Sequence, residues 1–222
     1  ALSALVGVAR ADDEELRRIA TEALGQYGSL DPLVVLVRAL EDDSETVQRT
    51  AILSLIQLFA DAPNGRSQAV RSEVAAQLQS LDSVAVIPPL LDVMEESNRW
   101  RIRRNAAWLL GHVTDTDGDY TEDVYDCLID ALDDEDEVTA GLAAASLAEL
   151  GSDSLERRLH IIVQDETHSP QAIAYAKDVL EEIGSDLSKE LVTNSVDYTY
   201  VRDPADYTDR KRDQREGGAD DT

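Results

Sequence analysis

The stretch that decides the fold is DEELRRIATEALG, residues 13–25. Its apolar residues recur at intervals of three and four, which places them on one face of a helix: Leu16, Ile19, Ala20, Ala23 and Leu24. Asp13 precedes this face and is expected to cap the helix, because a carboxylate accepts bonds from the free N–H groups there. Gly25 follows it and is expected to end the helix in the left-handed conformation.

The same pattern returns further along the chain. Residues 99–111 read RWRIRRNAAWLLG and set Ile102, Arg103, Ala106, Leu110 and Gly111 in the places of Leu16, Arg17, Ala20, Leu24 and Gly25. Looser copies occupy residues 44–55, 137–151 and 172–184. The repeated pattern resembles the second helix of a HEAT repeat, in the variety named after phycobilin lyases. The resemblance implies an all-α protein, a right-handed α-solenoid built from stacked helix pairs.

The rest of the chain divides around this repeat. About five helix pairs are expected over residues 1–184, with one inserted helix at about 66–81, because the second and third pairs lie unusually far apart. No stretch shows the sustained alternation of a strand. Residues 185–222 are polar and hold few aliphatic side chains, so we expect an extended C-terminal tail.

The composition is strongly acidic. The chain holds 46 acidic and 20 basic residues, for a net charge of −26. Such charges repel one another in the folded state, and molar salt screens the repulsion to within about 3 Å. We interpret this acidity as adaptation to a salty cytoplasm, as in salt-accumulating archaea. Nucleic acid is not expected as a partner, because phosphate binding relies on clustered Lys and Arg.

This interpretation gives a first testable prediction. The melting temperature is expected to rise steeply between about 0.1 M and about 2 M KCl, because screening removes repulsion that weakens the folded state. Circular dichroism melts over a series of salt concentrations measure it. A flat response would assign the acidic surface to another role, such as binding a basic partner.

The cysteine content and the lack of apolar runs indicate where in the cell the protein is expected. Cys127 is the single cysteine, so no intrachain disulfide forms, and its core spacing favours a buried inert thiol. No apolar run approaches the ~20 residues of a membrane span. The first ten residues lack the basic start of a signal peptide. We therefore expect a cytoplasmic protein without direct membrane insertion.

Arginines form the first candidate site. The resemblance implies a structural role for Arg17 and Arg103, which would tie neighbouring repeats together through acidic residues or carbonyl groups. Arg99 and Arg101 have no such explanation, and they flank Trp100. Arg and Trp dominate binding hot spots, so these three residues are a candidate docking surface for an acidic protein. The alternative is that carboxylates of adjacent repeats pair with both arginines.

An Asp-rich loop is the weak candidate for a metal site. Its carboxylates alternate along the chain: Asp115, Asp117, Asp119 and Asp123. A twelve-residue calcium loop needs glycine at its sixth position and usually Glu at its twelfth, where this chain has Tyr120 and Asp126. We therefore expect diffuse attraction of cations here and no specific metal ion.

No catalytic motif is found. His112, His160 and His168 are not followed by Glu, unlike the iron-binding His-Glu dipeptides of the HEAT-repeat deoxyhypusine hydroxylases. No P-loop, HExxH motif or nucleophile elbow occurs. The sequence thus favours a non-catalytic scaffold without a cofactor, an adaptor or accessory subunit of a complex such as a respiratory redox enzyme or taxis machinery. The alternative is a prosthetic-group lyase or a chaperone that inserts a cofactor.

The tail is a candidate docking arm for a partner protein. Its aromatic anchors are Tyr198, Tyr200 and Tyr207, since Tyr joins large contact area to few rotatable bonds. Arg210 and Arg212, on either side of Lys211, would meet acidic surface. The alternative is a solvated tail that aids solubility.

Overall fold

The computed structural model describes residues 2–27, 29–60, 67–165 and 167–190, and regular structure in these residues is helical throughout. The first helices of the pairs are α1 (Leu2–Val8), α3 (Leu33–Arg38), α6 (Ser83–Glu96), α8 (Thr121–Asp130) and α10 (Asp153–Gln164). Their second helices are α2 (Glu14–Gly25), α4 (Glu45–Ala60), α7 (Trp100–Val113), α9 (Glu137–Leu150) and α11 (Pro170–Glu190). Short 3₁₀ turns, Ala39–Glu41 and Ala131–Asp133, extend α3 and α8.

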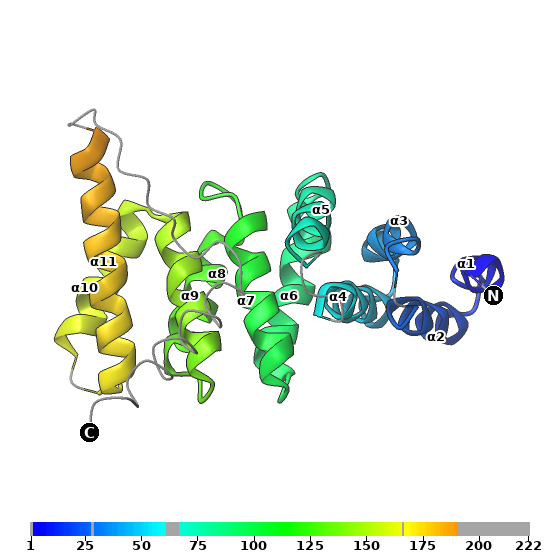
Figure 1. The fold of residues 1–222 in the computed structure, drawn as a ribbon, viewed down its shortest axis with the longest axis horizontal. Coiled ribbons are helices and arrows are strands. Elements are labelled where there is room, and N and C mark those ends of the chain that lie inside the picture. The colour runs from blue at the N-terminus through cyan, green and yellow to red at the C-terminus, as the bar shows by residue number, and fades with distance from the viewer. Residues whose placement is uncertain (1, 28, 61–66, 166, 191–222) are drawn as a thin grey trace, which may run out of the picture.

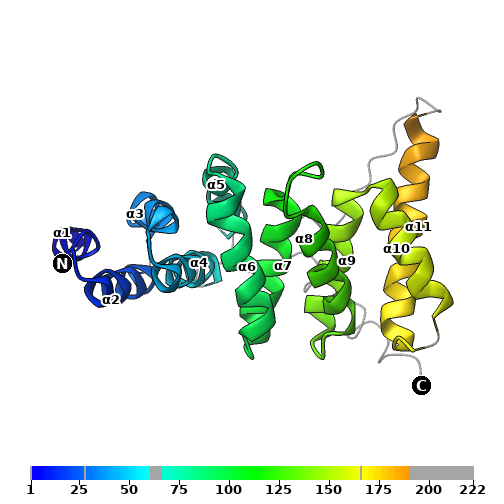
Figure 2. The same cartoon turned by 180° about the vertical axis from the view of Figure 1, so that it is seen from behind.

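The pairs follow one another along an elongated α-solenoid (Figures 1 and 2), which confirms the predicted class. The second helices stack side by side, with the most extensive contacts between α7 and α9 and between α2 and α4. In Figure 1 the helices from α6 onward run across the long axis, whereas α1 and α3 are seen nearly end-on. The helix direction therefore turns between α4 and α6, next to the inserted helix α5 (Ser67–Gln79).

The core runs continuously through the described pairs and consists mainly of Leu, Ile, Val and Ala. Ala20, Ala51, Ala106 and Ala143 are each at most 1% exposed, and they recur on the second helices. Small side chains at this position let neighbouring helices approach closely, which suits a thin array of helix pairs. Tyr125 is fully buried, and its hydroxyl donates a hydrogen bond to Ser152 Oγ at 3.0 Å.

The N-terminal caps agree with the sequence. Asp13 Oδ1 accepts a hydrogen bond from the Leu16 N–H at 2.9 Å, as predicted. Asp136 does the same for the Thr139 N–H at 2.8 Å. These carboxylates satisfy N–H groups that have no partner within the helix, so they fix where the helices begin.

The predicted role of Gly25 is wrong. Gly25 is the last residue of α2, and the one glycine with positive φ among the described residues is Gly151. A Cβ added at Gly25 would lie 2.5 Å from Ser54 Cβ, and at Gly111 it would lie 2.6 Å from Ser146 Cβ. Both glycines therefore permit contact with the next second helix rather than a left-handed turn.

A serine completes each of these contacts. Ser54 Oγ donates to the Thr21 carbonyl at 3.0 Å, and Ser146 Oγ donates to the Ala107 carbonyl at 2.9 Å. Each hydroxyl reaches the backbone of the preceding second helix across the space that glycine leaves open. The glycine and serine thus set the spacing of α2 to α4 and of α7 to α9.

The sequence predicted an inserted helix at about 66–81 and an end of the solenoid at residue 184. The inserted helix is α5, and the last helix, α11, continues past residue 184 to Glu190. The tail candidates Tyr198, Tyr200, Tyr207, Arg210 and Arg212 lie outside the described residues.

None of the described helices combines the length and hydropathy that a transmembrane span requires.

Candidate functional site

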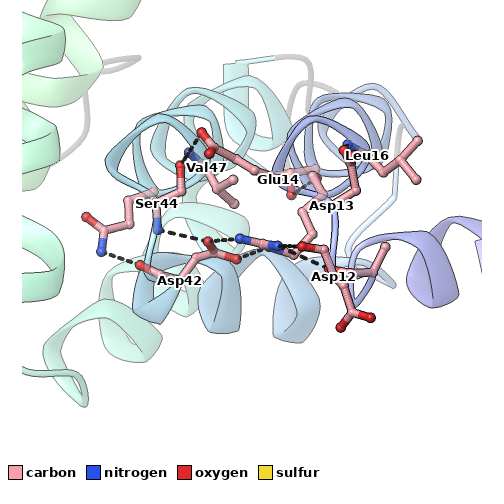
Figure 3. Close-up of polar contacts among 11 residues, drawn as sticks. Asp12, Asp13, Glu14, Leu16, Asp42, Ser44 and Val47 are labelled. Atoms are coloured by element: carbon pink, nitrogen blue, oxygen red, sulfur yellow. Dashed lines mark hydrogen bonds and ion pairs between the residues drawn. The ribbon is translucent and has the colours of Figure 1, made fainter.

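An arginine clamp joins the first two helix pairs (Figure 3). Arg17 Nε and Nη2 donate to the two carboxylate oxygens of Asp42 at 2.7 and 2.9 Å. Arg17 Nη1 donates to the carbonyl oxygens of Ala11 and Asp12, both at 3.1 Å. One guanidinium therefore links its own turn to the turn of the next pair, with the two-point geometry that suits a carboxylate.

The third and fourth pairs repeat this clamp. Arg103 Nε and Nη2 donate to the carboxylate oxygens of Asp134 at 2.6 and 2.7 Å, and Nη1 donates to the Ser97 carbonyl at 3.0 Å. These bonds confirm the structural role expected for both arginines. Gln48 takes the corresponding position in α4 and donates to the Asp42 carbonyl, within its own turn, at 2.7 Å.

The first clamp makes stability depend on pH. The hydrogen bonds from Arg17 lower the pKa of Asp42 below its usual 3.8 and outweigh the opposing effect of burial. A lowered pKa means that the ionised carboxylate stabilises the fold at pH values above its unfolded pKa. This contribution is lost as the pH falls through the still lower folded pKa.

Arg99, Trp100 and Arg101 form the candidate docking surface, here called the Trp100 patch. Arg99 is the N-cap residue of α7, and Trp100, the first helical residue, is 40% exposed. The guanidinium carbons of Arg101 and Arg104 lie 5.1 and 4.8 Å from the centre of the indole ring. Two cations thus hold the exposed ring by cation–π contact.

The surroundings of the Trp100 patch bear on the alternative, in which carboxylates pair with its arginines. Within the described residues, neither Arg99 nor Arg101 forms an ion pair. Glu96, which is close in sequence, pairs with Arg49. The structure therefore brings the three patch residues together at one exposed helix start, without carboxylate partners from the described chain.

The Asp-rich loop lies between α7 and α8. Asp115 Oδ1 accepts from the Asp117 N–H at 3.2 Å, and the Asp115 carbonyl accepts from Thr121 Oγ1 at 2.7 Å. Asp123 already belongs to α8. In the described part of the chain, no three His, Cys, Asp or Glu side chains come together as a metal-binding group.

An acidic groove between α6 and α8 was missed by the sequence reasoning. Its volume is about 640 Å³, and its apolar lining comes from Leu91, Met94, Cys127 and Ala131. Among the described residues, Arg103 is the one cation in its lining, against six carboxylates: Glu95, Asp123, Asp126, Asp130, Asp133 and Asp134. Burial, followed by Asp130 and Glu95, raises the pKa of the Cys127 thiol to about 12. The half-buried thiol is thus protonated at neutral pH and is a poor nucleophile, as its spacing predicts.

The sequence does contain a signal for this groove. Residues 38–43 read RALEDD and the matching residues 130–135 read DALDDE, so Asp130 stands where Arg38 stands in the second pair. The equivalent groove between α1 and α3 is lined by Arg10, Arg17 and Arg38 among its carboxylates. Comparing the repeats position by position would have found the change of charge.

Helix pairs joined by repeated clamps and glycine–serine contacts define a helical-repeat protein. The sequence profile described as HEAT repeats matches residues 1–64 and 55–148. This chain belongs to the HEAT-repeat family.

Several known proteins are similar to the chain. The HEAT repeat-containing taxis protein OE_2401F of Halobacterium salinarum is 32% identical over 146 residues, which are 65% of this chain and 35% of that protein. The chain thus spans about a third of that relative's length, and the relative supports the expected halophilic archaeal origin. A designed armadillo repeat protein for modular peptide recognition is 18% identical, with a TM-score of 0.43 over 82% of this chain and 81% of its own. The archaeal HEAT-like repeats protein from Thermococcus onnurineus NA1 is 19% identical, with a TM-score of 0.37 over 83% of this chain and 87% of its own.

Proposed function

We propose that this protein is a non-catalytic scaffold that binds another protein, as an adaptor or as an accessory subunit of a larger complex. The Trp100 patch carries the proposal. It combines an exposed Trp with cations that form no ion pair in the described chain, and such residues dominate the energy of protein interfaces. The HEAT-repeat fold, which typically serves protein interaction, supports this function.

The charge of the Trp100 patch indicates its partner. A chain with a net charge of −26 repels other acidic proteins over most of its surface. Arg99 and Arg101 make the surface locally positive, so an acidic protein is attracted there. Arg101 and Arg104 hold the indole ring in place before binding, so little side-chain entropy is lost on association. The patch therefore suits an acidic surface with an apolar pocket for the ring.

The relative bears on which complex the scaffold serves. Sequence reasoning left respiratory redox enzymes and taxis machinery as alternatives. The similar protein from Halobacterium salinarum is named as a taxis protein. We propose taxis machinery as the first complex to test for this chain.

The tail supplies a second proposed contact. Tyr198, Tyr200 and Tyr207 would anchor it to the partner, with Arg210 and Arg212 meeting acidic surface. Two linked contacts bind more tightly than either alone. Once the first contact has formed, the second is intramolecular and has a high effective concentration. Deleting residues 192–222 is expected to weaken complex formation and to leave the melting temperature unchanged.

The test is affinity capture from a haloarchaeal lysate in about 2 M KCl, with partners identified by mass spectrometry. Trp100→Ala and the double variant Arg99→Ser, Arg101→Ser are each expected to reduce recovery of a wild-type partner by at least tenfold, about 1.4 kcal/mol. Ile161→Ala is the matched control, because Ile161 is 65% exposed and far from the patch in sequence. Circular dichroism melts establish that each variant stays folded.

Two results would count against the proposal. Equal recovery of the partner by wild type and both patch variants would remove the Trp100 patch from the interface. Stoichiometric binding or turnover of a prosthetic group by the purified chain would instead favour the lyase or insertion factor.

A further inference from the structure

The acidic groove between α6 and α8 lies in the middle of the array, with a helix pair on either side of the two pairs that form it (Figures 1 and 2). Its volume of about 640 Å³ falls within the range of ligand-binding clefts, roughly 300–1,000 Å³. Met94 and Ala131 in its lining are buried, and Leu91 and Cys127 are half-buried. The groove therefore offers an apolar side chain of a ligand a contact out of water.

Half of the carboxylates in the acidic groove already have basic partners within the described chain. These pairs are Asp134 with Arg103, Asp126 with Arg158, and Asp133 with His168 at 3.9 Å. The other carboxylates are exposed and form no ion pair with any described residue: Glu95, Asp123 and Asp130. Their charges are therefore available to a ligand.

The available carboxylates stand on both sides of the acidic groove. Glu95 belongs to α6, whereas Asp123 and Asp130 belong to α8. Burial contributes most to the raised pKa of the Cys127 thiol, and Asp130 and Glu95 add to it from the two helices. Negative charges from opposite sides therefore act on the same point of the lining. A cation is favoured there, because charges beside an apolar surface are screened less than charges in open water.

The general acidity of the chain does not account for this groove. The equivalent groove between α1 and α3 is lined by Arg10, Arg17 and Arg38 against four carboxylates. Among the described residues, the acidic groove has one cation against six carboxylates. Adaptation of the whole surface to salt would act on both grooves alike. The excess of negative charge therefore belongs to this position in the array and calls for a separate explanation.

We propose that the acidic groove binds a cationic segment of a partner protein, in which lysine or arginine side chains meet Glu95, Asp123 and Asp130 around an apolar side chain. Carboxylates without partners beside an apolar lining complement a segment that has both features. The Trp100 patch is cationic and suits an acidic surface, so the groove takes a different segment and does not depend on that patch. The chain thus carries two sites that select segments of opposite charge.

The single methionine of the chain allows binding to be observed in the groove itself. Met94 belongs to the lining, so an isotope-labelled methionine methyl group gives an NMR signal from the acidic groove, and its loss in Met94→Leu assigns it. The probe is a peptide in which a central leucine lies between two pairs of lysines. It is added to the full chain at the lowest KCl concentration at which circular dichroism shows the chain folded. We expect the Met94 signal to shift until the site is saturated, and a peptide with glutamates in place of the lysines to leave it unchanged.

Charge variants separate the acidic groove from the general charge of the surface. The triple variant Glu95→Gln, Asp123→Asn, Asp130→Asn is expected to weaken peptide binding, measured by fluorescence anisotropy, by at least tenfold. It leaves the Arg103 clamp intact. The matched control neutralises three other exposed carboxylates that do not line the groove: Asp92→Asn, Asp178→Asn and Glu181→Gln. We expect the control to weaken binding by no more than about twofold, because salt screens charges that lie far from the peptide.

Three results would overturn the proposal. An unchanged Met94 signal at high peptide concentration would mean that the cationic segment does not enter the groove. Equal losses of affinity in the two triple variants would leave only general attraction between opposite charges. Binding by a chain that lacks residues 192–222, but not by the full chain, would assign the groove to the chain's own tail instead of a partner.

Discussion

Replacement of Arg103 by alanine is expected to lower the free energy of unfolding by about 2–4 kcal/mol, because it leaves a nearly buried carboxylate without its partner. The Asp134 side chain is 8% exposed and accepts two hydrogen bonds from Arg103. The variant also loses the bond from Arg103 to the Ser97 carbonyl. Urea denaturation in about 2 M KCl measures the change while the surface charge stays screened.

Arg18→Ala is the matched control for this clamp. Arg18 also pairs with two carboxylates, but Glu15 and Glu22 have side chains that are 64% and 56% exposed. Exposed ion pairs contribute roughly 0–1 kcal/mol, so the control is expected to lose no more than that. Equal losses of unfolding free energy in the two variants would contradict this role, because Arg103 would then contribute no more than an exposed ion pair does.

Replacement of Gly111 by alanine is the second large effect. The added Cβ would lie 2.6 Å from Ser146 Cβ and 2.9 Å from Ser146 Cα, so α7 and α9 must move apart. Overpacking of this kind costs about 1–3 kcal/mol, and separation of the helices also weakens the bond from Ser146 Oγ to Ala107. The gain of up to about 1 kcal/mol from replacing a helical glycine offsets part of this loss. We expect a net loss of about 1–3 kcal/mol by urea denaturation.

Gly7→Ala provides the control for this substitution. Gly7 lies within α1, and a Cβ added there meets no atom within 4 Å. The same change should therefore be neutral or stabilising at Gly7, because only helix propensity acts. Destabilisation at both glycines would contradict the close helix contact as the cause of the Gly111 effect.

The sequence predicted the fold and the clamps well because both depend on a local pattern that repeats. The spacing of N-cap residue, apolar residue and arginine in residues 13–17 recurs at residues 99–103, although the Arg99 side chain makes no capping hydrogen bond. Gly25 was misinterpreted because its role depends on Ser54, which belongs to another helix pair. A glycine beyond the last apolar residue is compatible both with a left-handed cap and with close packing, and only the neighbouring helix decides between them.

The candidate sites were predicted less completely. Arg99 and Arg101 stood out in the sequence as unexplained cations, but which arginines are paired depends on carboxylates in other repeats. The acidic groove was missed because it is formed by residues of two neighbouring helices, α6 and α8, rather than by the spacing within one helix. The contacts proposed for Tyr198, Tyr200 and Tyr207 remain predictions from composition.

The glutamine at position 48 has a mechanical consequence. Arg17 fastens the second pair to the first, and Arg103 fastens the fourth to the third, but Gln48 bonds only its own turn. Among the described residues, the polar link between α4 and α6 is the exposed ion pair of Arg49 with Glu96, which is expected to contribute less than a buried clamp. We therefore expect the array to bend most easily at α4, α5 and α6, where Figure 1 shows the helix direction turning. Bending there would change the distance between the first helix pair and the Trp100 patch without breaking either clamp. A scaffold built in this way can hold partners at more than one separation.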